Sequence, residues 1–432
     1  MRTALLSIVL GCWFLVCAHA DDWPQYRGPR RDDVSAEKGL LQSWPKEGPK
    51  LLWTNSNLGI GYSGVAVVGD RLYTIGGRED KEFLIALDLK NIKDNGAAEA
   101  WATEVGPLFQ FKTNQWSAGP SATPTVDGDL IFAIGGNGDL LCVDLTGKEK
   151  WRKNLPRELD AQVNPIGGGP KNLGWGFTAS PLVDGEQLVC IVGGPKGTVA
   201  ALEKKTGKEI WRSAELKDQA AYTSPVIAEF DGIKQYVVLT NQGLAGIAAK
   251  DGKALWSHRR MPAYGTEVVN TPIVSGSIVF TTVGVAQGCD AIKVLRDGVM
   301  FKTEKVYTNN NLSNHHGNVV RVGEHVYGFS QGKGWTCVAL QSGEAIWSER
   351  KFPAGSMTCA DGHFYCFSES DGTVVLTDVS KEGWKESGRF KLPQSSKLRK
   401  PSGRIWTPPV VSNGKLFLRD QELLFCYDVK GK

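Results

Sequence analysis

The chain has 432 residues, of which 41% are apolar and 22% are charged, with 51 glycines, 14 tryptophans and only 4 methionines. This composition is typical of an ordered, loop-rich globular protein and excludes a largely disordered chain. Fifty Lys and Arg residues against 46 Asp and Glu residues leave a net charge of +4, which is too small to indicate nucleic-acid binding.

The first 20 residues have the layout of a cleavable secretory signal. Arg2 precedes an apolar stretch from Ala4 to Val16, and Ala18-His19-Ala20 precedes an acidic start at Asp21. We expect cleavage near Ala20 and a periplasmic or otherwise extracytoplasmic protein. A lipid anchor at Cys12 is the less favoured alternative. The apolar stretch is shorter than the roughly 20 residues that a spanning helix needs, so we expect no membrane span.

The rest of the sequence is a repeat with a period of about 45 to 60 residues. Its clearest mark is a glycine turn followed by a tryptophan, and the copies are TGKEKW at 146–151, TGKEIW at 206–211, DGKALW at 251–256 and SGEAIW at 342–347, with a looser copy at 96–101. A Ser/Thr-Pro start and three short apolar segments separated by turns precede each tryptophan. Each repeat therefore predicts four antiparallel strands.

The spacing of the tryptophans predicts eight such blades. The interval between Trp256 and Trp347 holds two repeats, one of which ends near Tyr307 without a tryptophan. Residues 406–429 supply only three strands, and we expect Leu51-Leu52-Trp53 to provide the fourth. The prediction is an all-β, eight-bladed β-propeller over residues 49–432, preceded by an N-terminal strap at 21–48. Structural blade tryptophans are expected at Trp53, Trp101, Trp151, Trp211, Trp256 and Trp347, and we expect Trp151 and Trp211 to be buried.

Seven cysteines remain after the signal, and their spacing is not that of a disulfide framework. Cys142, Cys337 and Cys426 occupy the third-strand position where other repeats carry alanine or glycine. This position demands a small buried residue, which favours structural packing over reactivity. Cys359 and Cys366 flank one hairpin turn, and a disulfide between them is an open alternative.

The turns divide between two faces of the predicted propeller. The first and third turns of each blade are tight Asp-Gly and Thr-Gly-Lys turns, and we name their side the tight-turn face. The second turns and the links between blades lie on the opposite side, the long-loop face, and the longest links are 102–121, 156–176 and 391–405. Binding is expected on the long-loop face, because function collects on long loops held by a rigid scaffold.

Eight residues lead into the innermost strands from the long-loop face. We expect them to surround the mouth of the central channel, and they are Trp116, Trp175, Tyr222, Asn270, Asn314, His315, His316 and Trp406. The aromatic members could stack a sugar or a planar ring, with simple packing as the alternative. His315 and His316 suit a hydrogen-bonding, proton-transfer or metal role. Neighbours on a strand point to opposite sides, however, so we do not expect both to chelate one ion.

The remaining sequence patterns give weaker indications of function. Residues 385–404 contain seven basic residues and one acidic residue, which could contact an acidic partner or an anionic polymer, or form a solvated loop. Residues 59–64 match GxGxxG, but a strand rather than a helix is expected to follow. The sequence contains no GxSxG, Walker, HExxH or EF-hand motif, and its acidic residues do not select an acid and a base.

The Ala-Leu-Asp motif at 86–88 and the TGKxxW motifs resemble those of pyrroloquinoline quinone (PQQ)-like propellers. This superfamily holds quinoprotein alcohol dehydrogenases and BamB-like scaffolds of outer-membrane assembly. WPQYRGP at 23–29, NHHG at 314–317 and GWTC at 334–337 are similar to exported PQQ-like repeat proteins of planctomycete-type bacteria. The resemblance implies the fold and an extracytoplasmic compartment. Quinoprotein dehydrogenases carry adjacent cysteines and calcium-binding residues in long insertions, and this chain has no Cys-Cys pair. No catalytic, cofactor-binding or metal-binding residue is therefore transferred.

We expect an exported, monomeric, non-catalytic propeller that binds a protein or an envelope polysaccharide through its long-loop face and does not bind nucleic acid. The alternative is a quinoprotein-like oxidoreductase that acts on an alcohol or sugar with PQQ and calcium.

Overall fold

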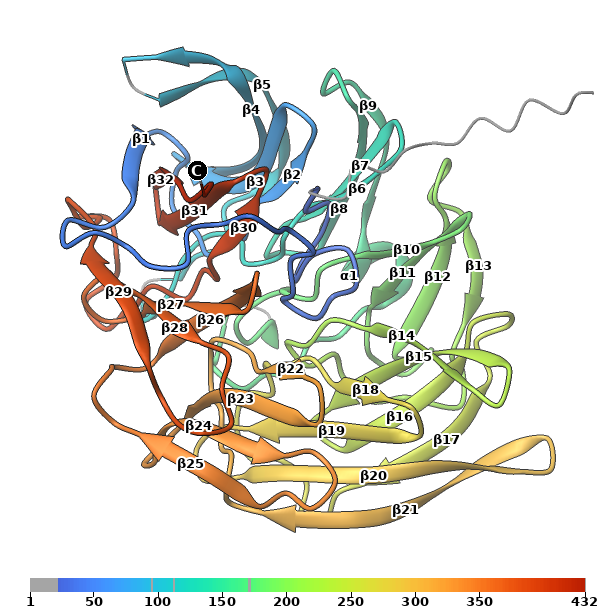
Figure 1. The fold of residues 1–432 in the computed structure, drawn as a ribbon. Coiled ribbons are helices and arrows are strands. Elements are labelled where there is room, and N and C mark those ends of the chain that lie inside the picture. The colour runs from blue at the N-terminus through green and yellow to red at the C-terminus, as the bar shows by residue number, and fades with distance from the viewer. Residues whose placement is uncertain (1–21, 95, 112, 170–171, 432) are drawn as a thin grey trace, which may run out of the picture.

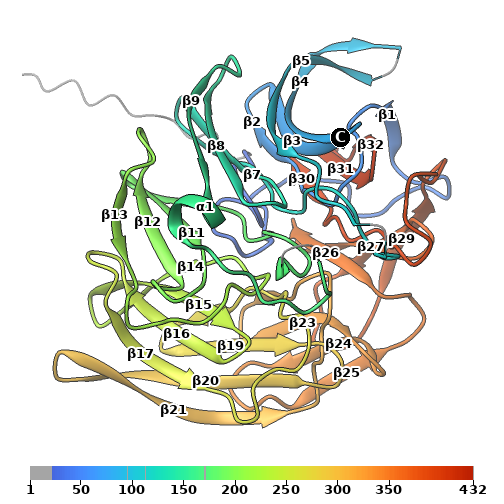
Figure 2. The same cartoon turned by 180° about the vertical axis from the view of Figure 1, so that it is seen from behind.

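A computed structural model describes residues 22–94, 96–111, 113–169 and 172–431. The expected signal peptide, residues 1–20, lies outside the described residues. Within these ranges the strands form eight four-stranded antiparallel sheets around a common axis (Figures 1 and 2). The prediction of an all-β, eight-bladed propeller is confirmed.

The blades follow one another in chain order. Blade 1 consists of β2 (Ala66–Val68), β3 (Arg71–Arg78), β4 (Lys81–Lys93) and β5 (Gly96–Pro107), and blade 2 of β6 (Thr125–Asp127), β7 (Leu130–Ile134), β8 (Asp139–Asp144) and β9 (Glu149–Asn154). Blade 3 consists of β10 (Leu182–Asp184), β11 (Gln187–Ile191), β12 (Val199–Glu203) and β13 (Glu209–Arg212), and blade 4 of β14 (Val226–Phe230), β15 (Ile233–Thr240), β16 (Gly243–Ala248) and β17 (Ala254–Arg259). A short helix, α1 (Leu155–Leu159), follows β9.

Blades 5 to 8 repeat the arrangement. Blade 5 consists of β18 (Ile273–Ser275), β19 (Ile278–Val283), β20 (Gly288–Asp297) and β21 (Met300–Asn309), and blade 6 of β22 (Val320–Val322), β23 (His325–Ser330), β24 (Gly334–Ala339) and β25 (Ala345–Glu349). Blade 7 consists of β26 (Gly355–Ala360), β27 (His363–Ser368), β28 (Thr373–Asp378) and β29 (Glu386–Lys391), and blade 8 of β30 (Val410–Ser412), β31 (Lys415–Asp420), β32 (Leu423–Asp428) and β1 (Lys50–Asn55).

The two ends of the chain meet in blade 8. Strand β1 pairs antiparallel with β32, placing Lys50 opposite Asp428 and Trp53 opposite Cys426. The prediction that an N-terminal strand closes the last blade is therefore confirmed. Ring closure of this kind pairs an edge that would otherwise stay open.

The repeated tryptophan faces a small residue on the third strand of its own blade. The register pairs Trp101 with Ala86, Trp151 with Cys142, Trp211 with Ala201, Trp256 with Gly246, Trp347 with Cys337 and Trp53 with Cys426. This pairing explains why cysteine alternates with alanine and glycine there, as the repeat indicates.

The expected burial is confirmed for Trp211 and is wrong for Trp151. Trp53, Trp211 and Trp256 are buried, whereas Trp101, Trp151 and Trp347 are half-buried. The fourth strand forms the outer rim of the ring (Figure 1), so part of its side chains faces solvent.

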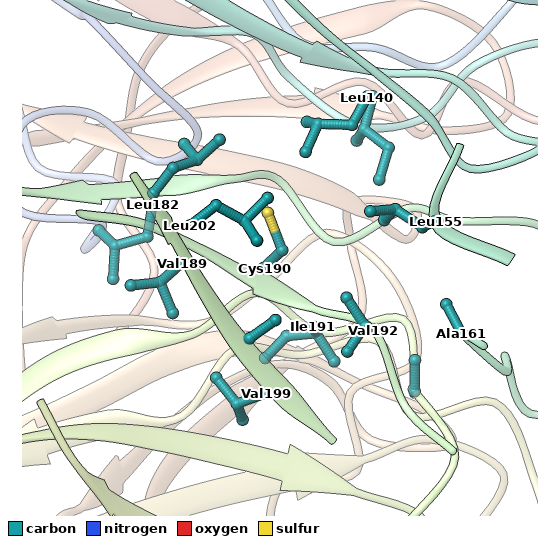
Figure 3. Packing of buried hydrophobic residues seen from close by; sticks show 14 of the residues in the cluster. Leu140, Leu155, Ala161, Leu182, Val189, Cys190, Ile191, Val192, Val199 and Leu202 are labelled. Carbon is teal, nitrogen blue, oxygen red and sulfur yellow. The ribbon is translucent and has the colours of Figure 1, made fainter. Parts of the chain in front are cut away.

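The core lies between neighbouring blades. Figure 3 shows one cluster in which Leu140 of blade 2 and Leu155 of α1 lie near Val189 and Leu202 of blade 3. Flat sheets stacked around an axis bury both faces in this way, so the ring is one packed body. The seven described cysteines are free and buried. Cys359 lies opposite Phe364 and Cys366 opposite Met357, so the hairpin disulfide does not form.

The strap crosses the tight-turn face and covers the axis there (Figure 1). It pairs with Val67 in the first strand of blade 1, with Cys359 in the first strand of blade 7, and with Lys430 just after the third strand of blade 8. The Arg31 guanidinium donates to the carbonyl oxygens of Pro181 and Pro225, the latter at 3.1 Å. These contacts tie distant blades together across the centre of the ring.

Helices are nearly absent from the ranges described above. Among those residues no helix is long and apolar enough to cross a membrane.

Candidate functional site

A cavity of about 570 Å³ opens where the central channel meets the long-loop face. Six of the eight expected residues lie on its wall: Trp116, Trp175, Tyr222, His315, His316 and Trp406. Tyr26 of the strap also lines it, and because the strap covers the axis from the other side, the channel ends as a pocket. The volume is within the range of small-molecule sites.

Asn270 and Asn314 do not line the cavity, contrary to expectation. Both are buried. The Asn270 side-chain amide donates to the Asn314 backbone oxygen at 2.7 Å, and the Asn314 amide donates to the Phe329 oxygen at 2.8 Å. They therefore tie blade 5 to blade 6, because a buried backbone oxygen needs a donor.

One wall is organised around Glu267, which lies on the link between β17 and β18. Its Oε1 accepts from the Trp175 indole nitrogen at 3.1 Å and its Oε2 from the Thr266 hydroxyl at 2.7 Å. His315 Nε2 lies 3.7 Å from Oε2. The His315 imidazole, with the Thr266 and Trp175 donors, holds the pKa of Glu267 well below its usual range, so this carboxylate is ionised.

His315 and His316 share one wall of the cavity, so the expectation that they point apart is wrong. They lie between β21 and β22 in a loop rather than on a strand, and their ring centroids are 4.1 Å apart. The His316 ring stacks on Trp406 with centroids 4.7 Å apart. Burial lowers the pKa of His316 to about 3, so it is neutral at physiological pH. Among the described residues, no three His, Cys, Asp or Glu side chains form a metal-binding group.

A second carboxylate of the cavity lies beside Trp406. The Trp406 indole nitrogen donates to Glu369 Oε2 at 3.1 Å. Glu369 lies in the second turn of blade 7, and burial raises its pKa. Glu267 and Glu369 were not among the predicted site residues, because they are far apart in the chain and match no motif. The signal that would have found them is position, since each lies on a link or a second turn of the long-loop face.

Trp116 stands at the mouth with 48% of its surface exposed. Its backbone is nevertheless fixed: the Asn114 side-chain oxygen accepts from the Trp116 backbone nitrogen at 2.8 Å, and the Tyr62 hydroxyl donates to the Trp116 oxygen at 3.0 Å. An exposed indole on a fixed backbone loses little freedom when a ligand stacks on it.

Four of the seven basic residues in the segment at 385–404 form ion pairs. Ion pairs join Lys385 to Asp378, Arg389 to Glu386, Lys391 to Asp371 and Arg399 to Asp420. Arg404 lines the cavity. About half of the segment's basic residues are therefore paired within the protein, and its expected role toward an acidic partner stays a prediction.

The repeat and the blade geometry are matched by a known family. Residues 86–349, more than half of the chain, match the family model described as outer membrane protein assembly factor BamB, of the PQQ type. The chain belongs to this family. This confirms the resemblance to PQQ-like propellers; the planctomycete-type subgroup stays an expectation. No curated protein matches the chain.

Solved structures agree on the fold of this BamB-type chain. BamB from Moraxella catarrhalis is 13% identical with a TM-score of 0.58, covering 89% of this chain and 98% of that chain. The computationally designed Ika8 protein is 11% identical with a TM-score of 0.53, covering 88% of this chain and 100% of that chain. A europium-containing methanol dehydrogenase is 11% identical with a TM-score of 0.49, covering 92% and 89%. The likeness to the first two structures shows the propeller architecture alone.

The residues of the cavity do not fit the cofactor that the superfamily implies. PQQ is a tricarboxylate, yet Glu267 and Glu369 present carboxylates to the same cavity, where Arg404 is the only Lys or Arg among the lining residues. Like charges at close range oppose binding in a partly desolvated site. Calcium takes six to eight oxygen ligands, and both Glu267 oxygens are already engaged by Trp175 and Thr266.

Proposed function

We propose that this protein is an extracytoplasmic, non-catalytic binding propeller that holds an envelope partner through the pocket on its long-loop face. The observation that carries the proposal is the blind cavity of about 570 Å³ with Trp116, Trp175 and Trp406 on its wall. A rigid ring supplies the frame and the links supply the contacts, which is the usual division between scaffold and binding loops.

The shape of the site favours a polymer end over a flat protein surface. Protein interfaces of standard size bury about 800 Å² on each partner, whereas this site is a closed pocket that takes a small group in depth. Tryptophan faces pack well against the C–H faces of sugar rings. An envelope polysaccharide is therefore the partner that suits the pocket best.

The oxidoreductase alternative is the weaker one. The two carboxylates of the cavity oppose the binding of an anionic cofactor, and we assign a catalytic role in oxidation to none of the described residues. We therefore derive no catalytic step, and the choice between the two functions rests on ligand binding.

Co-sedimentation of the purified protein with insoluble envelope polysaccharide tests the proposal. Trp116→Ala should reduce capture at least about tenfold, because one buried aromatic anchor contributes on the order of 1.4 kcal/mol or more. Its melting temperature should stay close to that of the wild type, since about half of the Trp116 side chain is exposed in the free protein. Val299→Ala is the matched control, because Val299 is 82% exposed on the tight-turn face. Wild-type capture by Trp116→Ala, or loss of capture by Val299→Ala, would contradict the proposal.

A further inference from the structure

We infer that the pocket selects an amino sugar whose amine is free and positively charged, with the Glu369 carboxylate as its counter-ion. The inference rests on the proposed function and names the chemical class of the polymer end that the pocket would accept. It is drawn from which polar atoms of the cavity are already engaged and which remain free.

Glu369 is the carboxylate with an oxygen to spare. Within the described residues its Oε2 accepts from the Trp406 indole, and no hydrogen bond engages its Oε1. Glu267 differs, because both of its oxygens already accept hydrogen bonds from Trp175 and Thr266. A ligand ammonium would therefore find its acceptor at Glu369. Removing a carboxylate from water without a partner is costly, and a charged donor would offset that cost.

The rest of the wall suits a sugar rather than a simple amine. Ser117, Ser121, Thr123 and Gln331 line the cavity beside the tryptophans. Hydroxyl and amide groups exchange hydrogen bonds with sugar hydroxyls, whereas the tryptophan faces attract both C–H faces and cations. A plain aromatic cage for a small amine would not need the hydroxyl groups.

The positively charged and titratable groups of the pocket leave its preference for a positively charged amine in place. His316 is neutral because of its burial. Arg404 donates through Nη1 to the oxygens of Ser402 at 3.4 Å and Gly403 at 3.2 Å, and its positive charge favours the ionised form of Glu369 without an ion pair between the two side chains. Among the Asp, Glu, Lys and Arg side chains, the lining holds two carboxylates, Glu267 and Glu369, against the single guanidinium of Arg404. The pocket therefore favours an added positive charge over an added negative one.

Titration calorimetry at about pH 6, where sugar amines carry a proton, tests the inference. The probes are trisaccharides of glucosamine, N-acetylglucosamine, glucose and glucuronic acid, together with ethanolamine. The glucosamine trisaccharide should bind at least about tenfold more tightly than the glucose and N-acetylglucosamine forms, the ratio expected of one charge-assisted hydrogen bond. The glucuronic acid form and ethanolamine should bind more weakly still.

Glu369→Gln keeps the shape of the side chain and removes its charge. It should abolish the preference for glucosamine while leaving affinity for the glucose trisaccharide unchanged. Glu382→Gln, at an exposed residue of the tight-turn face, is the matched control and should behave as wild type.

Three results would overturn the inference: equal binding of charged and neutral trisaccharides, ethanolamine binding as tightly as the trisaccharide, or a preference that survives Glu369→Gln. Absence of binding by every probe would overturn it too. Failure of the proposed function can be distinguished from failure of this inference, because the co-sedimentation test with Trp116→Ala does not depend on the charge of the sugar.

Discussion

Trp151 of blade 2 packs directly on Gly207, the glycine of the third turn of blade 3. A β-carbon at Gly207 would stand 2.8 Å from Cε3 of Trp151, which is closer than real β-carbons approach other atoms. The Trp151 indole also donates to the Lys204 oxygen of the same turn at 2.9 Å. The Thr-Gly-Lys-x-x-Trp repeat therefore joins successive blades: the glycine of one copy receives the tryptophan of the copy before it.

Gly207→Ala should destabilise the protein for two reasons. Its φ of +72° is strained for alanine, and the added methyl group collides with Trp151. Gly185→Ala is the matched control, because Gly185 has a φ of +61° but nothing within 4 Å of the added β-carbon. Urea unfolding should show Gly207→Ala less stable than Gly185→Ala by about 1 to 3 kcal/mol, the usual cost of overpacking. Equal stability of the two variants would refute the interblade contact.

Trp211→Ala should cost about 3 to 5 kcal/mol of unfolding free energy, the range for removing a large buried side chain. Trp211 is 8% exposed and stacks on Tyr236 of the next blade with centroids 6.0 Å apart. Chemical unfolding of this variant checks the expectation. A loss below about 1 kcal/mol, as surface substitutions give, would mean that the tryptophan does not stabilise the blade contact.

The buried ion pair of the strap should contribute far more to the free energy of unfolding than the exposed ion pair next to it. Arg27 Nε lies 2.6 Å from Asp33 Oδ2, and both side chains are buried. Arg27→Met should cost about 3 to 5 kcal/mol, because it leaves a buried carboxylate unpaired. Arg27→Met with Asp33→Asn should cost less than Arg27→Met alone. Asparagine is chosen because residue 33 has a φ of +58°.

Arg30 and Asp32 provide the control for this pair. Their side chains are 59% and 37% exposed, so Arg30→Met should change stability by less than about 1 kcal/mol. All of these values come from urea unfolding of the purified proteins. A double variant that loses as much stability as Arg27→Met alone, or more, would contradict the pairing argument.

Glu82 should make stability fall as pH rises toward neutrality. Its carboxylate is fully buried, accepting from the backbone nitrogens of Phe109 at 3.0 Å and Gly136 at 2.9 Å. Burial raises its pKa from 4.5 to about 7. The folded state therefore holds this proton more tightly than the unfolded chain. The stabilisation is full below about pH 4.5 and is lost as pH rises through about 7.

The difference between wild type and Glu82→Gln isolates this effect. The free energy of unfolding of the wild type, minus that of the variant, should fall by a few kcal/mol across the interval. Unfolding curves measured at several pH values check the sign. Parallel pH profiles for the two proteins would show that Glu82 does not titrate in this range.

Much of the fold could be predicted from local sequence patterns. The turn-plus-tryptophan repeat, the Ser/Thr-Pro starts and the missing eighth tryptophan were enough to predict eight blades and the closure by Trp53, because each blade is a short-range unit. The burial of Trp151 was not predictable in the same way. It depends on where the rim of the ring meets solvent, which no single repeat encodes.

The site was predictable only in part, because it is assembled from separate links. Position relative to the innermost strands was enough to bring Trp116, Trp175 and Trp406 to one cavity. The loop that lets His315 and His316 share a wall, and the indole contacts that recruit Glu267 and Glu369, come from packing across blades. Sequence spacing carries no record of that packing.

The central claim is that the channel mouth is a partner-binding pocket and not a cofactor site. Titration calorimetry of the purified protein with PQQ, with and without calcium, tests it most directly. The account predicts no saturable heat in either condition, because two carboxylates face the cavity. Saturable, calcium-dependent binding at micromolar or tighter affinity would contradict it and would favour a quinoprotein-like oxidoreductase.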